Sequence, residues 1–284
     1  NTPPWLYWRW CDAYGEACAR NIAAAHLEEP ALDLSVRADA DGWAKRLRGE
    51  LLPWGSLRIR LKGRVEDIDG YTEGEWWVQD AAAALPALLL GDVKNKRVAD
   101  LCAAPGGKTA QLAARGAVVT AVDISEPRLR RLRENLARLN LKAGIVQADA
   151  AEWTSARRFD AILLDVPCSA TGTIRRNPDI PYLKSEADLA KLLPLQRRLL
   201  ENALCLLKPG GCLVYSTCSL EPEEGEAQID WLLSNHGEIK LVPVDAPSLC
   251  IPPEAVTPAG MLRTLPFHCG GMDGFFAAKI EKSA

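Results

Sequence analysis

The fold of this chain is indicated most directly by one segment, Asp100-Leu-Cys-Ala-Ala-Pro-Gly-Gly-Lys-Thr109. Residues 97–101 have the composition of a short strand, and residues 107–115 have that of a helix. Two glycines at a strand-to-helix junction let the backbone approach a ligand closely and leave N–H groups of the first helical turn free for a polar group. The segment therefore predicts a ligand-binding loop in a Rossmann-like fold.

The two common phosphate-binding loops do not match this segment. A Walker A loop needs a glycine five residues before the Gly of Gly-Lys-Thr, and Cys102 occupies that position. The dinucleotide fingerprint Gly-x-Gly-x-x-Gly is also absent from the sequence. We therefore do not expect a P-loop nucleotide hydrolase here.

Carboxylates follow the next two predicted strands. Asp123 follows the apolar run 118–122, where a carboxylate can accept hydrogen bonds from both hydroxyl groups of a ribose. Asp149 follows residues 144–148 and is placed to reach an adenine amino group. This spacing favours a nucleoside cofactor without a pyrophosphate, S-adenosylmethionine, over a nicotinamide cofactor or a degenerate site. Helix capping by the two carboxylates is the alternative explanation.

Strands and helices alternate from residue 76 onward. The predicted strands are 97–101, 118–122, 144–148, 159–164, 212–216 and 274–280, and the predicted helices are 80–90, 107–115, 126–140, 188–207 and 223–235. Repeated strand–helix–strand units predict an α/β fold with a mostly parallel sheet covered on both faces. Ligands of such sheets bind at the carboxyl ends of the strands.

Residues 1–75 are predicted to form a separate, small α+β domain before the larger domain at residues 76–284. Helices are expected from Pro4, over 16–27, and from a cap at Asp41 to about residue 52, with strands at 32–36 and 57–61. Most of the nine tryptophans precede residue 77. Stacking on nucleic-acid bases is one explanation, but packing in the core and between domains is favoured.

The composition is that of an ordinary globular protein. Of the 284 residues, 48% are hydrophobic and 25% are charged, and the net charge of −3 does not indicate a nucleic-acid binder. No apolar run approaches the ~18 residues of a membrane span, so we expect no membrane association. Basic clusters at 58–64, 128–133, 157–158 and 175–176 are as well explained by solvated faces as by a phosphate-binding patch.

The cysteines and the start of the chain bear on cellular location. Nine cysteines occur with three histidines and without any Cys-x-x-Cys pair, so we expect no metal site and reduced thiols in a cytoplasmic protein. The chain begins at Asn1 without a secretory signal or an initiator methionine, so we expect further sequence upstream.

Two cysteines follow neighbouring predicted strands, in Asp165-Val-Pro-Cys168 and in Ser216-Thr-Cys218. Each cysteine alone is more often a small buried apolar residue than a nucleophile, and a redox pair usually has the Cys-x-x-Cys spacing. Methylation of a pyrimidine carbon, in contrast, requires a thiolate: addition to C6 of cytosine makes C5 nucleophilic toward a sulfonium methyl group. Asp165 is the candidate for the protonated carboxyl group that would assist at N3.

Four motifs together resemble the Sun/NOL1/NOP2 family of RNA cytosine-5 methyltransferases, and most nearly its bacterial RsmB (Sun/Fmu) branch. They are Leu101-Cys-Ala-Ala-Pro-Gly-Gly-Lys-Thr109, Leu164-Asp-Val-Pro-Cys-Ser-Ala-Thr-Gly172, Arg175-Arg-Asn-Pro-Asp-Ile180 and Leu207-Lys-Pro-Gly-Gly-Cys-Leu-Val-Tyr-Ser-Thr-Cys-Ser219. The resemblance extends from about Pro4 to Ile280. It implies a class I methyltransferase domain and an RNA-recognition-like unit at residues 1–75.

The resemblance also implies roles for individual residues. Asp123 would hold the ribose of S-adenosylmethionine, Asp149 would lie on its adenine side, and Asp165 would lie between the cofactor and the target base. Cys218 would be the nucleophile, and Cys168 would assist release of the methylated RNA. Lys108 reaches either the active site or a backbone or phosphate group at the helix start. The expected cofactor loop comprises Cys102, Ala103, Ala104, Pro105, Gly106, Gly107 and Lys108.

The substrate implied by the resemblance is RNA, and most directly 16S ribosomal RNA of the small subunit. Another RNA, such as tRNA, and a non-catalytic role in ribosome assembly are the alternatives, and a monomer is favoured. An unpaired cytosine is expected as the target, with Arg175 and Arg176 holding flanking phosphates. The RsmB pattern includes a NusB-like domain before the region that this chain covers; we expect either that this domain has been cut away or that the protein is a shorter relative. The sequence also has Val166 where alanine is usual.

Overall fold

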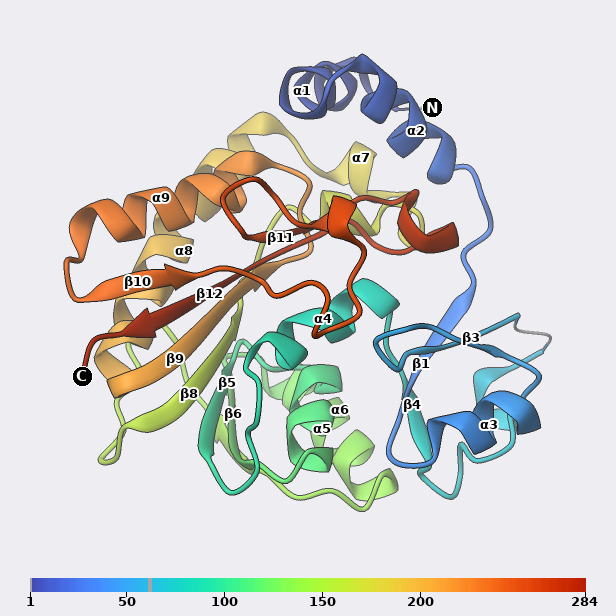
Figure 1. The fold of residues 1–284 in the computed structure, drawn as a ribbon, viewed down its shortest axis with the longest axis horizontal. Coiled ribbons are helices and arrows are strands. Elements are labelled where there is room, and N and C mark those ends of the chain that lie inside the picture. The colour runs from blue at the N-terminus through green and yellow to red at the C-terminus, as the bar shows by residue number, and fades with distance from the viewer. Residues whose placement is uncertain (1, 61–62) are drawn as a thin grey trace.

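The larger of two sheets in the computed structural model runs through the middle of the molecule (Figure 1). The structure describes residues 2–60 and 63–284. The strands of this sheet lie in the order β10-β12-β9-β8-β5-β6-β7, with β11 paired to β12. Their bounds are β5 Arg97–Leu101, β6 Val118–Asp123, β7 Gly144–Gln147, β8 Phe159–Asp165, β9 Leu207–Thr217, β10 Ile239–Val242, β11 Leu262–Thr264 and β12 Phe275–Lys282.

Parallel pairing dominates the centre of this sheet. β5 pairs in parallel with β6 and β8, β6 with β7, and β8 with β9, whereas β12 pairs antiparallel with β9, β10 and β11. A mostly parallel sheet flanked by helices confirms the predicted Rossmann-like α/β fold. β10 and β11 lie outside the predicted strands.

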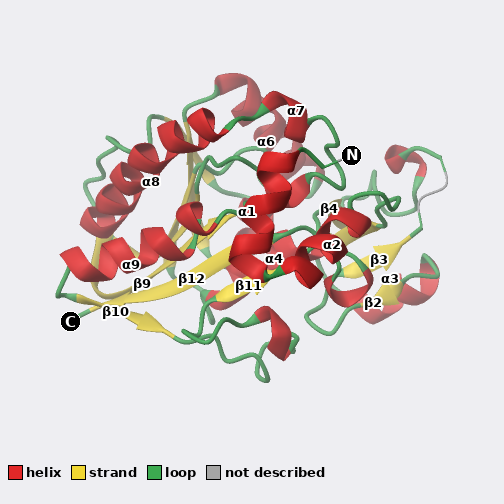
Figure 2. Ribbon diagram, turned by 90° about the horizontal axis from the view of Figure 1, so that it is seen from above, coloured by secondary structure: helices red, strands yellow, loops and turns green. Residues whose placement is uncertain are grey.

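Helices cover both faces of the sheet because successive side chains of a buried strand point to opposite sides. On β8, Ile162 and Leu164 pack in the core that includes α8 and α9, whereas Ala161 and Leu163 pack in the core that includes α4. Seen from above, α8 and α9 run along one side of the sheet (Figure 2). The helix bounds are α4 Ala81–Leu89, α5 Gly107–Ala114, α6 Glu126–Arg138, α7 Ile180–Leu183, α8 Glu186–Leu206 and α9 Glu226–Asn235.

The second sheet lies near the N-terminus and is antiparallel, in the order β2-β3-β1-β4. Its strands are β1 Leu32–Val36, β2 Glu50–Leu51, β3 Leu57–Ile59 and β4 Trp76–Val78. Of the strand predicted at 57–61, Leu61 lies outside the described residues. β4 follows the proposed boundary at residue 75 and pairs with β1, and the division at that residue stays a prediction.

The helix predicted from Asp41 to about residue 52 is shorter and is capped by a different residue. α3 spans Ala40–Arg46, and the side chain of Asp39 accepts the N-terminal hydrogen bond from the Gly42 N–H. The prediction of Asp41 as the cap is therefore wrong. The chain leaves the helix early because β2 pairs with β3 through Glu50 and Arg58.

The first two helices lie apart from the small sheet. α1 spans Pro4–Tyr14 and α2 spans Glu16–Ala25. Leu6 and Trp10 of α1 are fully buried and pack with Ile174, Leu220 and Leu265 of the larger part of the chain. Figure 1 shows α1 and α2 at the edge of the molecule, next to α7 and far from α3.

Tryptophan burial agrees with packing as the favoured interpretation. The buried indoles are those of Trp10, Trp43, Trp54, Trp76 and Trp77; Trp43 and Trp76 share one hydrophobic cluster, and the other three lie in three further clusters. Trp8 is 63% exposed. Within the described part of the chain, no helix combines the length and the hydropathy needed to cross a lipid bilayer.

Candidate active site

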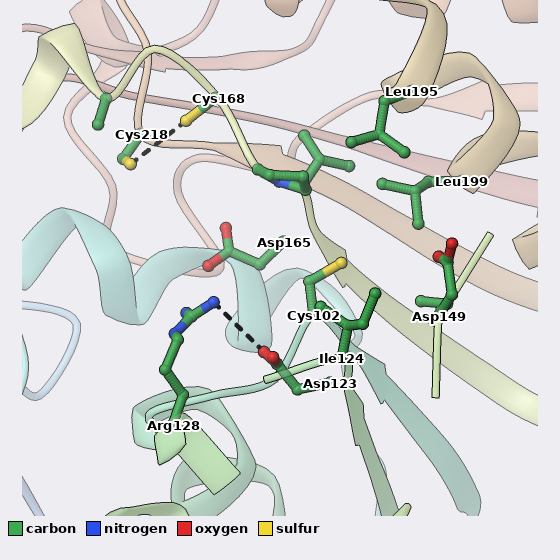
Figure 3. Close-up of a pocket in the computed structure, with 14 residues that line it drawn as sticks. Cys102, Asp123, Ile124, Arg128, Asp149, Asp165, Cys168, Leu195, Leu199 and Cys218 are labelled. Carbon is green, nitrogen blue, oxygen red and sulfur yellow. Dashed lines mark hydrogen bonds and ion pairs between the residues drawn. The ribbon is translucent and has the colours of Figure 1, made fainter. Parts of the chain in front are cut away.

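A pocket of about 350 Å³ lies at the carboxyl ends of the five parallel strands β9, β8, β5, β6 and β7 (Figure 3). The chain order reverses between β5 and β8, and such a switch point is where ligands bind in open α/β sheets. The pocket is lined by Cys102, Asp123, Ile124, Arg128, Asp149, Ala150, Asp165, Val166, Pro167, Cys168, Ala170, Leu195, Leu199 and Cys218. Six of the predicted site residues are therefore brought together by the fold.

The glycine-containing loop after β5 is held against β6. The Ala103 N–H donates to the Val122 carbonyl (3.0 Å), and the Ala104 N–H donates to Asp123 Oδ2 (3.0 Å). Gly106 has a φ of +104°, and a Cβ there would lie 2.7 Å from Leu132 Cγ of α6, so a side chain does not fit. Of the predicted cofactor loop, Cys102 lines the pocket, while residues 103–108 lie next to it without forming its wall.

Asp123 both lines the pocket and supports the surrounding backbone. Its Oδ1 accepts a hydrogen bond from the Ser125 N–H (2.9 Å), and Arg128 Nη1 lies 3.5 Å from its Oδ2. Capping and ligand binding are thus compatible, because each carboxylate oxygen can accept more than one hydrogen bond. Arg128 also donates to the Ala104 carbonyl, so it connects α6 to the glycine loop.

Asp149 occupies the far end of the pocket, beside Leu199 (Figure 3). Its Oδ1 accepts from the Ala151 N–H at 2.9 Å, as capping predicts. The walls nearby are apolar and include Ile124, whose side chain is 65% exposed, and Leu195 of α8. A flat apolar group with a polar edge would suit this end of the pocket.

The two cysteines meet at the opposite end. Cys168 Sγ lies 3.4 Å from Cys218 Sγ, although the two residues are 50 positions apart in sequence. The hydrogen bond to Cys218, together with burial and the negative charge of Glu224, raises the pKa of Cys168 well above its usual range. Burial likewise raises the pKa of Cys102, which lies lower in the pocket in Figure 3. Cys168 is therefore a thiol at neutral pH.

Lys108 contacts Asp165, a residue that lines the pocket, so its side chain is directed toward the predicted active site. Its Nζ donates to Asp165 Oδ2 at 2.8 Å, and Ser216 Oγ donates to Asp165 Oδ1 at 2.9 Å. The ammonium group also lies 4.8 Å from the ring centre of Phe275. Burial acts to lower the pKa of Lys108, but the Asp165 charge outweighs this and raises it. Lys108 is therefore charged and directed at Asp165.

The prediction that Arg175 holds a phosphate is wrong. Its side chain is buried and pairs with Asp80, with Arg175 Nη2 3.2 Å from Asp80 Oδ2. Arg176 pairs with the buried Asp273 through two of its nitrogens, and its side chain is 41% exposed. Of these two arginines, Arg176 is the one whose side chain stays accessible to a phosphate.

Several pocket residues were not predicted from sequence. Arg128 belongs to a basic cluster that a solvated helix face explains equally well, and its contact with Asp123 depends on the rotation of α6. Leu195 and Leu199 are four residues apart, a helical spacing typical of any core-facing helix. Neither signal distinguishes a pocket wall from ordinary packing.

The residues present suit an adenosyl sulfonium ligand. Carboxylates at Asp123, Asp149 and Asp165 offer acceptors for hydroxyl and amino groups and are complementary to a positive charge. The apolar wall at Val166 and Leu199 offers a surface for a purine ring. The carboxylates and the apolar wall of the pocket therefore fit such a cofactor, and the two thiols lie at one end of the same pocket.

Comparison with known proteins gives consistent matches. A family model described as 16S rRNA methyltransferase RsmB/F matches residues 87–281. The chain is 38% identical to the ribosomal RNA small subunit methyltransferase B of Salmonella arizonae over 295 residues, and 37% identical to the protein of that name from Pasteurella multocida over 300 residues. These alignments cover 99% of this chain but only 66% and 65% of the two relatives.

A solved structure shows the same fold. It is a methyltransferase homolog protein from Pyrococcus horikoshii, 32% identical in sequence, with a TM-score of 0.81. The match covers 96% of this chain and 93% of that protein. The similarity therefore extends beyond the larger sheet into residues 1–75.

Proposed function

The chain belongs to the RsmB/F family of 16S rRNA methyltransferases, and on this premise we propose that it transfers a methyl group from S-adenosylmethionine to C5 of a cytosine in RNA. Small-subunit ribosomal RNA is the proposed substrate. The observation that carries the proposal is the thiol pair of Cys168 and Cys218, 3.4 Å apart at one end of a pocket rich in carboxylates. Methylation of an amino group needs no thiol pair at this position.

The proposed cofactor site is the part of the pocket away from the cysteines. Asp123 would accept hydrogen bonds from the ribose, and Asp149 would accept one from the adenine amino group, with Leu199 against the ring. S-Adenosylmethionine bound there supplies an electrophilic methyl group. Cys102 would lie close to its sulfonium side and, as a thiol of raised pKa, would stay neutral.

Cys218 is the proposed nucleophile. Its Sγ, as a thiolate, adds to C6 of the target cytosine, and the electrons of the C5–C6 double bond then make C5 nucleophilic. A proton or positive charge at N3 favours this addition. We assign this role to Asp165, which would pass to N3 the proton that Lys108 Nζ donates to its Oδ2 across 2.8 Å.

Cys168 is proposed to assist release. Once C5 has formed its bond to the methyl carbon, with the sulfonium electrons staying on the donor sulfur, the C5 proton leaves to water and the N3 proton returns to Asp165. The electrons of the C5–H bond restore the C5–C6 double bond, and those of the C6–S bond return to Cys218 Sγ. Cys168 holds its proton tightly and lies 3.4 Å from that sulfur. Its S–H can therefore donate a hydrogen bond to the departing thiolate, which stabilises it as it forms.

The proposed function is tested by incubating the protein with methyl-labelled S-adenosylmethionine and small-subunit ribosomal RNA. We expect label in RNA as 5-methylcytosine, and we expect none with Cys218→Ala. Cys205→Ser is the matched control, because Cys205 is an exposed cysteine of α8; it should transfer label as the wild type does. Wild-type turnover by Cys218→Ala would show that the nucleophile is assigned wrongly.

A further inference from the structure

A buried carboxylate that the proposed reaction does not use lies beneath the two cysteine loops. Glu224 is fully buried in the short 3₁₀ helix Pro222–Glu224, six residues after Cys218. Both of its carboxylate oxygens accept from the Ser169 N–H, at 2.9 and 3.1 Å, and Oε2 also accepts from Ser169 Oγ at 2.5 Å. Gln196 of α8 donates to Oε1 at 2.9 Å. A buried carboxylate is thus held almost entirely by the residue after Cys168.

The hydroxyl of Ser169 extends this contact to the other cysteine loop. Ser169 Oγ lies 3.0 Å from Ser219 Oγ, and Ser219 directly follows Cys218. Each hydroxyl has a single proton. Because Ser169 donates its proton to Glu224, Ser219 must donate to Ser169, and Ser219 Oγ in turn accepts from the Glu221 N–H at 2.9 Å. The hydrogen bonds therefore run in one direction toward the Glu224 carboxylate.

Backbone contacts hold the same two loops together. The Gly172 N–H donates to the Cys218 carbonyl at 3.0 Å, and the Leu220 N–H donates to Thr171 Oγ1 at 2.9 Å. A Cβ on Gly172 would lie 1.8 Å from the Gly274 carbonyl oxygen, so at this point the loop packs directly against the Gly274 backbone. These contacts connect the backbones of the two loops that carry Cys168 and Cys218.

We infer that Glu224 is a positioning residue that acts through Ser169: it holds Cys168 beside Cys218 and keeps the proton of the thiol pair on Cys168. Its negative charge is one of the causes that raise the pKa of Cys168, after the hydrogen bond to Cys218 and burial. With the proton held on Cys168, its S–H is the donor toward Cys218 Sγ, 3.4 Å away. The kinetic consequence of this inference rests on the proposed function, but the location of the proton does not.

The neighbouring Tyr215 and Gln196 do not supply the negative charge that raises the pKa of Cys168. Tyr215 of β9 faces it, and burial raises the pKa of this phenol well above its usual range, so it stays neutral. Its hydroxyl donates to the backbone carbonyl of Glu224 at 2.6 Å. The group that α8 contributes to the carboxylate is the neutral amide of Gln196. Among the described residues, the charges of Cys218 and Glu224 contribute to the raised pKa of Cys168, whereas the cations Lys108 and Arg176 interact electrostatically with Cys218.

The location of the proton is tested by alkylation without RNA or methyl donor. Wild type, Glu224→Gln and Glu223→Gln are treated briefly with iodoacetamide at pH 8, and mass spectrometry of the peptides gives the alkylation ratio of Cys168 to Cys218. Loss of the buried charge should raise this ratio about threefold or more in Glu224→Gln. Glu223 is the matched control, because its side chain is 43% exposed and pairs with Arg9. A ratio equal to that of the wild type in Glu224→Gln would overturn the inference.

Turnover tests the positioning role separately. Ser169→Ala keeps the Glu224 carboxylate and removes the hydroxyl that joins the two loops. It therefore tests the positioning role even if Glu224→Gln fails to fold. We expect kcat to fall roughly tenfold or more with KM for RNA unchanged, because only the alignment of the thiols is lost. A wild-type kcat in Ser169→Ala would contradict the inference. An absence of transfer by the wild-type protein itself would instead contradict the proposed function, and the alkylation ratio would still test Glu224.

Discussion

At the scale of single residues, the sequence places the reactive groups but does not assign their roles. Asp165, Cys168 and Cys218 are predicted at strand ends, and the structure brings all three to one pocket. The choice of Cys218 as the nucleophile comes from the family resemblance, because the chemistry of a thiol is the same at either position. Glu224 escapes sequence reasoning because its partner Ser169 is 55 residues away.

Substitution of the second cysteine should trap the enzyme on its product. In Cys168→Ser, a shorter side chain with a more tightly held proton faces the departing sulfur, so release slows more than addition does. We expect a covalent protein–RNA adduct that survives denaturing electrophoresis, with Cys205→Ser forming none. If Cys168→Ser turns over without any adduct, Cys168 has no part in release.

The ion pair between Lys108 and Asp165 should be needed for chemistry rather than for binding. Lys108→Met keeps the length of the side chain and removes the charge that lies 2.8 Å from Asp165. We expect kcat to fall about 100-fold or more, with S-adenosylmethionine affinity, measured by calorimetry, changed far less. Lys191→Met removes a lysine from a surface pair and serves as the control. Equal kcat values for the two variants would exclude Lys108 from the reaction.

At the scale of elements, the alternation of apolar strands and amphipathic helices is sufficient to predict the parallel part of the large sheet. Short elements are less predictable because pairing partners decide them. β4 has only three residues and exists because Leu34 of β1 pairs with Val78. The residue that caps α3, Asp39, lies two positions before the predicted cap. Asp39 adopts a left-handed backbone conformation, which local composition does not reveal.

The junction of β5 and α5 should make stability depend on pH. Asp100 of β5 is buried, its Oδ2 accepts from Thr109 of α5, and its Oδ1 has no hydrogen-bond partner among the described residues. Burial raises the pKa of Asp100 from 3.8 to about 7. The folded protein therefore binds this proton more tightly than the unfolded chain does, and the resulting stabilisation is lost as pH rises from about 4 through 7.

In Asp100→Asn the side chain at position 100 is neutral at every pH, so this variant should lack the loss of stability that ionisation of Asp100 causes. Urea unfolding at pH 5 and pH 8 should show that the wild type loses stability relative to Asp100→Asn at the higher pH. Asp230→Asn, at an exposed position of α9, should follow the wild type at both values. If the free energies of unfolding of the wild type and Asp100→Asn differ by the same amount at pH 5 and pH 8, the raised pKa of Asp100 is contradicted.

At the scale of the whole molecule, the N-terminal helices are joined to the loop that carries Cys218. Arg9 Nε lies 2.7 Å from Glu221 Oε2, and Trp10 Nε1 donates to Glu221 Oε1 at 3.1 Å. Tyr14 donates to the Leu220 carbonyl. No sequence pattern predicts these contacts, because they join residues more than 200 positions apart.

Loss of Arg9 should weaken this junction. Arg9→Ala leaves the buried Glu221 carboxylate without its cation, which we expect to lower the free energy of unfolding by about 1–3 kcal/mol. Arg20→Ala removes an exposed partner of Glu16 on α2 and should leave the urea midpoint unchanged. Equal urea midpoints for Arg9→Ala and the wild type would mean that the junction does not contribute to stability.

The central claim is that Cys218 bonds to a cytosine, and a substrate that cannot be released tests it most directly. RNA containing 5-fluorocytosine has no C5 proton to lose, so the bond to the nucleophile should persist after methyl transfer. We predict that peptide mapping of the trapped complex, formed with S-adenosylmethionine, finds the nucleotide on Cys218. An adduct on Cys168 would contradict the account, as would a complex with no covalent bond to the protein.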